Sequence, residues 1–507
     1  MKLKMHREKS DVLSKIIGVF FIILFAFILA GKCLYLFNVL PFSVSIVGTG
    51  AIIFIFLGIC KYYYNIIDKL SNILYIIRKQ SYLKLLFIIV IVSLLTKIIA
   101  LFVLNINSID SHPDINVYVT SASELSENGI VERFANYCYS YSHMFWFAVF
   151  LSPITKMFGV SQMYLSLYMI IINIISTIML YDVVVFRFSK VKAFVAFLLY
   201  ALLPSQILLP QYITHENALL FFISIAVWLY FKVISSCAKK VNKIIAFAFF
   251  SVFILFSTMV NSSGFVVLIS FLIIFTIEVM RGFNRRKVLC GFIKISSLVL
   301  VVVFGTMLFN IVQISCSNID EDYVKVNKVV WTLYVGSNYE TGASWSKSDA
   351  DKFSEYDSDY SKSKINDYHM NLLKERYMDL FSKPQNLINL IKTKIISIWG
   401  NFDYSLTLAN DYILSINTKT FYNTILFKPL IFINYLILLV LSIFCFISLI
   451  KQRNDRKSIF CVFAELYLLG STALLMLTEI SNKYTIAMLP FFLLACVILI
   501  KNKPEIS

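Results

Sequence analysis

Residues 85–105 read LLFIIVIVSLLTKIIALFVLN, an apolar run that contains a single charge, Lys97. A run of about 20 apolar residues is long enough to cross the hydrocarbon core of a bilayer as a helix, and a helix satisfies its own backbone hydrogen bonds there. Similar runs recur along the whole chain, and the short alternating segments typical of transmembrane β-strands are not visible between them. The sequence therefore predicts an all-α polytopic membrane protein.

The composition agrees with this fold class. Of the 507 residues, 59% are hydrophobic and only 15% are charged, whereas soluble domains have about 45–50% apolar residues. The net charge of +17 does not predict nucleic-acid binding, because Lys and Arg form short clusters between the apolar runs, as the positive-inside rule expects. The first apolar run, about 16–30, has no small-residue cleavage site after it, so it is predicted to be a retained helix.

The basic clusters also predict the topology. A short apolar stretch at 144–158 is interrupted by Pro153 and followed by Gly159. If it crossed the membrane, four basic clusters downstream would face outward; if it lies in the outer interface, all four face the cytoplasm. We therefore predict an interfacial helix there, both termini in the cytoplasm, and about twelve transmembrane helices in the cell (plasma) membrane of a bacterium. These helices lie near 14–34, 44–60, 85–105, 161–181, 193–210, 217–234, 244–260, 263–280, 295–314, 425–450, 458–478 and 484–500.

Four regions follow from this topology, and one of them is a polar outer segment of roughly 110 residues, long enough for a small folded domain or an ordered loop. Cys138 and Cys316 both fall in predicted outer segments and could form a disulfide, which sequence alone does not establish. The regions are an N-terminal hairpin with a cytoplasmic loop (1–84), a membrane core (85–314) with a first outer loop (106–160), the polar outer segment (315–424) and the C-terminal helices (425–507).

The first outer loop contains residues that could carry chemistry. Asp110 and Asp114 are carboxylates four positions apart, with His112 between them. At the edge of the bilayer, a carboxylate can act as a general base on a hydroxyl group or hold a divalent cation. A solvated loop, in which Asp precedes a turn, is the structural alternative. His143, just before the interfacial helix, is either a cavity residue or a polar residue at the interface.

Two further outer turns carry candidates. Glu216 begins a helix, where the helix dipole favours a carboxylate; it could equally face the same cavity as Asp114. Lys483 and Tyr484 lie between the last two predicted helices. A lone Lys on the outer side opposes the positive-inside bias, which indicates a phosphate-binding cation, and snorkelling to the membrane surface is the alternative.

These residues form an ordered set. In the first outer loop an acidic residue is followed at fixed offsets by Tyr, Ala, Leu and Gly: Asp114, Tyr118, Ala122, Leu125 and Gly129. The chain resembles the GT-C superfamily of membrane glycosyltransferases over about residues 85–500, particularly the bacterial relatives of protein O-mannosyltransferases and lipid A aminoarabinose transferases. Further positions match in order: Phe158-Gly159, Arg187, Pro204, Glu216, Glu479, Lys483, Tyr484 and Pro490, while Gly336-Ser337-Asn338, Gly342, Trp345 and Asp349 resemble an outer loop of Gram-positive members.

The resemblance implies transfer of a sugar from a polyprenyl-phosphate donor to an outer acceptor, which is a cell-envelope glycan, a lipid or a protein. Many members have a second acid directly after the catalytic Asp, where Ile115 stands here, so the use of a divalent cation stays open. Many have Arg at the place of Lys483, and an ammonium cannot make the bidentate phosphate contact of a guanidinium. The implied roles are Asp114 as catalytic base and Asp110, His143, Glu216, Lys483 and Tyr484 as substrate-binding residues.

Two other classes share parts of this pattern. An O-antigen-type polymerase or ligase also has about a dozen helices and one long outer loop, and it usually relies on outer Arg and His. A lipid or glycan transporter generally has broken helices, charges near the middle of the membrane and inverted repeats. The predicted spans are nearly free of central charge, with Glu465 as the main exception, which favours the enzyme.

Overall fold

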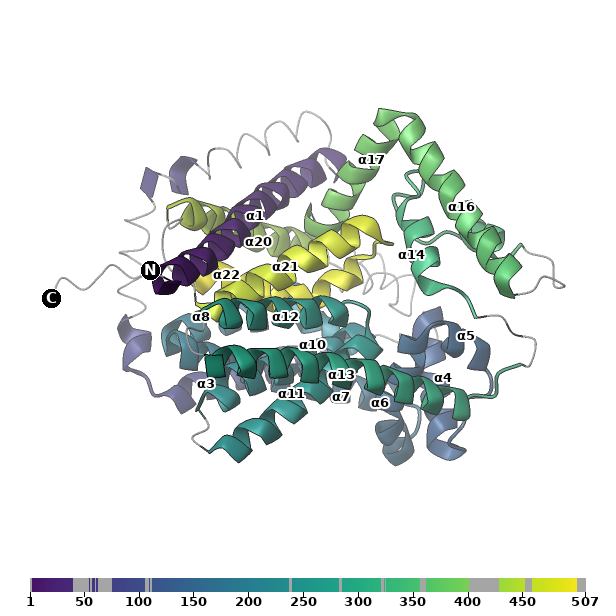
Figure 1. Cartoon of the computed structure of the whole chain (residues 1–507), viewed down its shortest axis with the longest axis horizontal. Coiled ribbons are helices and arrows are strands. Elements are labelled where there is room, and N and C mark those ends of the chain that lie inside the picture. Colours follow the sequence, from purple (N-terminus) through teal and green to yellow (C-terminus); the bar gives the residue numbers. More distant parts are fainter. Residues whose placement is uncertain are drawn as a thin grey trace.

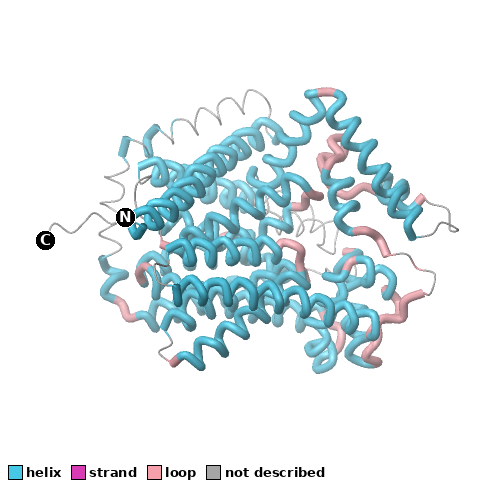
Figure 2. The backbone as a smooth tube through the Cα atoms, viewed as in Figure 1, coloured by secondary structure: helices cyan, strands magenta, loops and turns pink. Residues whose placement is uncertain are grey.

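The computed structural model describes most of the chain, and every regular element in the described part is a helix (Figure 2). The only extended pairing there is an isolated parallel bridge between Val131 and Ser317. The prediction of an all-α protein is therefore confirmed for this part. The described residues are 2–39, 54, 57–59, 61, 62, 75–104, 109, 112–236, 239–281, 285–320, 323, 325–355, 362–400, 428–451 and 458–498.

Eight of the described helices are long and apolar enough to cross a membrane, which makes this a multi-pass architecture. A bent pair, Lys190–Leu202 and Pro204–Gln211, raises the number to nine if it forms one span, and Gly264–Met280 and Lys483–Val497 are shorter apolar helices. The predicted count of twelve stays a prediction, since most of the expected helix at 44–60 lies outside the described residues. The eight are Lys15–Tyr35, Tyr82–Leu104, Gln162–Arg187, His215–Ile234, Lys240–Val260, Val288–Ser315, Pro429–Ile450 and Ile459–Leu477.

These helices form one bundle, in which they run side by side across Figure 1. Its centre is filled by aromatic rings, such as Phe271 and Phe463 at 4.7 Å between centroids, and tight packing of this kind holds membrane helices together where lipid removes the hydrophobic driving force. The elements are α1 (Lys2–Val39), α3 (Tyr82–Leu104), α7 (Gln162–Arg187), α8 (Lys190–Leu202), α9 (Pro204–Leu208), α10 (His215–Trp228), α11 (Lys240–Val260), α12 (Gly264–Arg281), α13 (Arg285–Ser315), α20 (Lys428–Lys451), α21 (Ile459–Leu477) and α22 (Leu489–Ile498). Between them lie the 3-10 helices η1 (Leu209–Gln211) and η5 (Asn482–Met488) and the short π-helices η2 (Leu229–Ile234) and η3 (Ile396–Gly400).

One expected helix is interrupted, and proline is the reason. The sequence predicts one helix near 193–210, but the chain bends by 67° between α8 and α9. Leu203 has ψ 126°, which is the extended conformation that a following proline imposes, and Pro204 then begins α9. The helix expected near 484–500 begins as the 3-10 helix η5 and continues as α22 without a break, because Leu489 keeps helical angles of φ −60° and ψ −43°.

Three helices cover one end of the bundle, here called the Asp114 end: α4 (Pro113–Glu127), α5 (Ala135–Ser140) and α6 (Ser142–Phe158) (Figure 1). α4 ends two residues before Gly129, whose φ is +76°, a backbone conformation that favours glycine. α6 is not among the helices long enough to cross a membrane, and its side chains Phe145, Phe147 and Leu151 are buried against α4 and its neighbours. Its placement in the membrane interface stays a prediction.

The described part of the predicted polar segment 315–424 has four α-helices at the Asp114 end, here called the α14–α17 segment: α14 (Lys328–Gly336), α15 (Lys347–Ser354), α16 (Lys362–Ser382) and α17 (Pro384–Ile395). It is joined to the loops around α5 through Asp320, whose backbone N–H donates to Asn136 Oδ1 at 3.1 Å, and through Tyr323, whose hydroxyl lies 2.7 Å from Ser140 Oγ. Cys138 and Cys316 are both free thiols. Residues 401–427 lie outside the described part.

Candidate functional site

Asp114 is held in the first turn of α4. His112 caps this helix, because its Nδ1 accepts the backbone N–H of Asp114 at 3.2 Å, and Pro113 occupies the first helical position, where no N–H donor is required. The helix dipole favours a carboxylate in the first turn. The Asp114 side chain is 28% exposed, so it can meet a molecule that enters from outside the bundle.

Lys483 comes from the opposite part of the chain and pairs with Asp114. Its Nζ lies 3.2 Å from Asp114 Oδ2, and its side chain is 15% exposed. The ammonium also lies 5.7 Å from the ring centre of Tyr484. The sequence leaves two interpretations of Lys483, a phosphate-binding cation and a side chain that snorkels to the membrane surface. The ion pair with Asp114 places Lys483 in a site of polar residues rather than alone at the membrane surface.

A buried triad lies behind Asp114. The hydroxyl of Tyr118, one turn further along α4, lies 3.0 Å from His215 Nδ1, and His215 Nε2 lies 3.2 Å from Glu216 Oε1. Burial raises the pKa of Tyr118 well above its ordinary value, and the carboxylate of Asp114 adds to this effect. The triad links α4 to the start of α10, so Glu216 takes part in this site in addition to lying in the first helical turn.

His143 and Lys328 form a second pair beside the triad, and both residues are half-buried. Lys328 Nζ lies 2.9 Å from His143 Nδ1, and the His143 ring is 4.9 Å from that of His215. Burial, and then the charge of Lys328, lower the pKa of His143 well below its ordinary value. Burial likewise lowers the pKa of Lys328 to about 8, an effect that the carboxylate of Glu479 opposes.

The turn that carries Glu479 and Lys483 is held by the α14–α17 segment. The backbone N–H of Glu479 donates to Thr332 O, and that of Ile480 donates to Ala343 O, both at 2.9 Å. A Cβ atom at Gly336 would lie 2.4 Å from the carbonyl carbon of Thr478, so only glycine permits this close approach. Burial raises the pKa of Glu479, and Lys483 partly offsets the effect.

Lys394 fastens the same turn from another side. Its Nζ donates to the carbonyl oxygens of Met476 at 2.9 Å, Thr478 at 2.8 Å and Leu475 at 3.3 Å. These carbonyls lie at the carboxyl end of α21, where the helix lacks acceptor partners of its own and where its dipole favours a cation. The ammonium of Lys394 is therefore a side-chain cap for α21.

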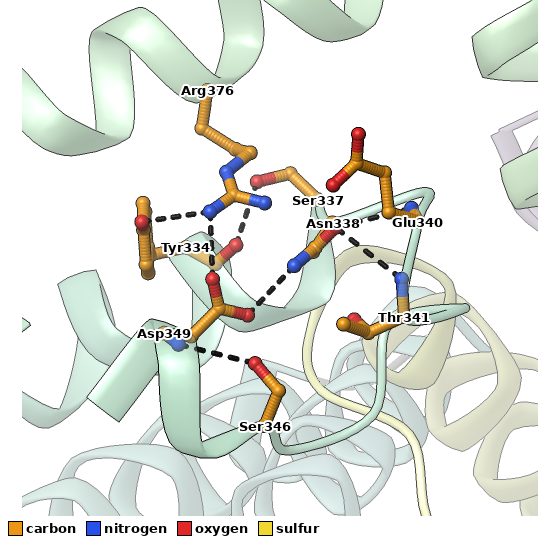
Figure 3. Close-up of polar contacts among 8 residues, drawn as sticks. All are labelled: Tyr334, Ser337, Asn338, Glu340, Thr341, Ser346, Asp349 and Arg376. Carbon is orange, nitrogen blue, oxygen red and sulfur yellow. Dashed lines mark hydrogen bonds and ion pairs between the residues drawn. The ribbon is translucent and has the colours of Figure 1, made fainter. Parts of the chain in front are cut away.

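A buried network keeps the α14–α17 segment itself in shape (Figure 3). Asp349 accepts hydrogen bonds from Arg376 and from the Asn338 amide, both at 2.7 Å, and Arg376 also donates to the Tyr334 hydroxyl at 2.7 Å. Asn338 Oδ1 in turn accepts the backbone N–H of Glu340 at 3.1 Å. The stretch from Gly336 to Asp349, singled out in the sequence, is therefore a scaffold that presents Ala343 O to the neighbouring turn.

The stretch from α9 to the first turn of α10 contains buried polar atoms that lack hydrogen-bond partners within the described part of the chain. They include both polar side-chain atoms of Gln211, and Asn217 Oδ1 and Gln206 Oε1. Such atoms are rare in proteins and call for a water molecule, an ion or a ligand. The backbone of Gln211 is anchored by Gln162, whose side chain donates to Gln211 O at 2.8 Å.

No group of three or more His, Cys, Asp or Glu side chains among the described residues is arranged to hold a metal ion. Asp110 lies outside those residues. The use of a divalent cation, which the sequence leaves open, therefore stays open.

The structure brings together five of the six predicted site residues: Asp114, His143, Glu216, Lys483 and Tyr484. Sequence reasoning missed Lys328 and Lys394. Both are Lys residues in a polar segment rich in Lys, and nothing in the local pattern distinguishes the buried ones from their exposed neighbours. No protein-family model matches the sequence, and no curated protein matches it.

Proposed function

We propose that this protein transfers a sugar from a polyprenyl-phosphate-linked donor to an acceptor on the outer face of the cytoplasmic membrane of a bacterium. The observation that carries the proposal is the pair of Asp114 and Lys483 at the end of an apolar bundle, 3.2 Å apart and partly exposed. A base and a cation side by side are what a displacement reaction at a sugar phosphate requires, because one group receives a proton while the other stabilises the departing anion.

The reaction would use the two groups in sequence. The donor phosphate replaces Asp114 as the anionic partner of Lys483, which releases the carboxylate. Asp114 then takes the proton from a hydroxyl group of the acceptor molecule. The oxygen of that hydroxyl bonds to the anomeric carbon of the sugar, and the bond between this carbon and the phosphate oxygen breaks. The phosphate leaves with the bonding electrons, and Lys483 stabilises its charge. Lys328, near Glu479 and His143, adds a second positive charge to the same region.

Two further features support a lipid-linked sugar. The bundle gives the polyprenyl chain an apolar surface that leads to the Asp114 end. The unpartnered atoms of the turn from Gln206 to Asn217 are mostly oxygens, and the hydroxyl groups of a sugar would donate hydrogen bonds to such acceptors.

A lipid or glycan transporter is the second candidate, because two features are typical of transporters. Lys97 is completely buried in α3, with Ser93 Oγ at 2.6 Å from its Nζ, and the pair α8–α9 is broken by a 67° bend. An O-antigen-type polymerase or ligase is less favoured. Such an enzyme would use an outer Arg, but Arg376 of the α14–α17 segment already donates hydrogen bonds to Asp349 and Tyr334.

The deciding experiment measures sugar transfer in membranes. Membranes that contain the wild type, Asp114→Asn or Glu127→Gln at equal levels are incubated with radiolabelled polyprenyl-phosphate sugars, and label that leaves the lipid fraction is followed. Glu127 is the matched control, since it is an exposed acid at the far end of the same helix. We expect transfer by the wild type and Glu127→Gln and none by Asp114→Asn. Equal transfer by Asp114→Asn would remove Asp114 from the role of base, and label that changes leaflet without leaving the lipid would favour the transporter.

A further inference from the structure

The hairpin of α16 and α17 exposes large apolar side chains on both sides of its turn. The exposed fractions are 57% for Met378, 64% for Phe381, 56% for Ile388 and 37% for Ile391. Grouped apolar residues on a surface mark a place where a protein meets a partner or a membrane. These four residues are here called the hairpin tip.

The chain leads directly from the hairpin tip into the membrane bundle. A Cβ atom at Gly31 would lie 2.9 Å from Ile395 O, at the end of α17, and one at Gly400 would lie 2.9 Å from the Tyr35 side chain. Gly31 and Tyr35 belong to the apolar span Lys15–Tyr35. α17 therefore ends beside a membrane-crossing segment, and a helix of 12 residues carries the chain only about 18 Å from there.

The direction of the two helices places the hairpin tip to the side of the bundle. In Figure 1 the bundle helices run from left to right, and α17 connects the bundle, beside α1, with the turn to α16. This turn lies about as far to the right as the end of α21, and α16 extends farther to the right. The hairpin tip thus lies beside the ends of the apolar spans at the Asp114 end. The first residues of α16 lie farther from those ends than its last residues.

The sequence around the hairpin tip has the pattern of a helix that rests on a membrane. Ile388 and Ile391 lie on one face of α17. Leu387 and Leu390 pack instead in a cluster with Leu380 of α16. Lys383 and Lys392 are exposed beside the apolar face, where their charges can reach phosphate head groups. The nearby Asp379 already accepts a hydrogen bond from Tyr339.

We infer that the hairpin tip inserts into the lipid head-group region at the Asp114 end and anchors the α14–α17 segment on the bilayer. The occupant of this apolar surface is phospholipid, because the tip lies beside the ends of the spans and its exposed apolar side chains are flanked by the exposed Lys383 and Lys392. The anchoring does not depend on the proposed sugar transfer. It restrains the same segment that holds the turn of Glu479 and Lys483.

Photocrosslinking of the full-length protein tests this inference. The residue p-benzoylphenylalanine is introduced singly at position 381, 388 or 364, and each protein is reconstituted into vesicles that contain radiolabelled phosphatidylcholine. Position 364 is the control, because Lys364 is exposed on the same helix but lies about 25 Å from Phe381 along its axis. After illumination, lipid attached to the protein is measured.

We expect at least about fivefold more labelled lipid on positions 381 and 388 than on position 364. Labelling at 381 and 388 that does not exceed the control would overturn the inference. So would crosslinks from both positions to a second protein chain in place of lipid, because the surface would then be a protein interface.

Discussion

Lys483 and Asp114 are 369 positions apart in the chain, yet their side chains form an ion pair of 3.2 Å. Both are partly exposed, and ion pairs of this kind contribute about 0–1 kcal/mol to stability. The fold holds the two groups together by other means. His112 and Pro113 fix Asp114, while backbone N–H groups of the turn before Lys483 donate to Thr332 O and Ala343 O and fix that turn. A pair that is held firmly but stabilises little is more typical of a functional site than of a structural one.

Replacement of Lys483 tests its role as the phosphate-binding cation. Lys483→Met removes the charge, and we expect the KM for the lipid-linked donor to rise about ten- to hundredfold, since a hydrogen bond to a charged group is worth about 1.5–3 kcal/mol. Lys483→Arg keeps the charge and should recover most of this loss. Initial rates against donor concentration provide the measurement. An unchanged KM in Lys483→Met would contradict the assignment.

The fold class could be predicted from the sequence because it depends on local properties. Apolar runs of about 20 residues define membrane helices wherever they occur. The bend at Pro204 was also readable in principle, since proline disfavours a helical conformation for the residue before it. The expectation of one helix near 193–210 gave too much weight to hydrophobicity over this rule.

The contacts of the site could not be predicted in the same way, because they depend on tertiary structure. The sequence suggested that Asp114, Glu216 and Lys483 share the outer side, but not that Lys483 pairs with Asp114. The pair of His143 and Lys328 joins α6 to α14, and no local pattern links those two helices. Several candidate partners of similar chemistry were present, and only packing selects among them.

The charge of Lys328 gives a test by pH. Burial lowers its pKa to about 8, so its ammonium loses a proton as the pH rises through about 8, whereas arginine stays charged. His143, with a pKa well below its ordinary value, stays neutral over this range. If the Lys328 charge supports donor binding, wild-type transfer falls between pH 7 and 9 while Lys328→Arg keeps its rate. A parallel decline in both proteins would assign the pH dependence to another group.

The network around Asp349 gives a test of stability. Arg376→Met leaves the carboxylate of Asp349, which is 3% exposed, without its charged partner. Breaking a buried ion pair from one side costs about 3–5 kcal/mol, and we expect earlier proteolysis of the α14–α17 segment and a lower melting temperature. Lys374→Met, at an exposed position on the same helix, is the control and should match the wild type. Wild-type resistance of Arg376→Met would mean that the network contributes little.

Replacement of Lys394 tests whether its cap on the carboxyl end of α21 positions the site. Lys394→Met removes a cation that donates to three carbonyl oxygens but does not alter the side chains of Asp114 and Lys483. We expect transfer to fall about tenfold, because the loss of a hydrogen bond to a charged group costs about 1.5–3 kcal/mol and the turn of Glu479 is no longer fixed. Lys394→Arg should restore part of the rate, and Lys347→Met, at an exposed position, should leave it unchanged. If Lys394→Met lowers the melting temperature but keeps the wild-type rate, the cap stabilises α21 without positioning the site.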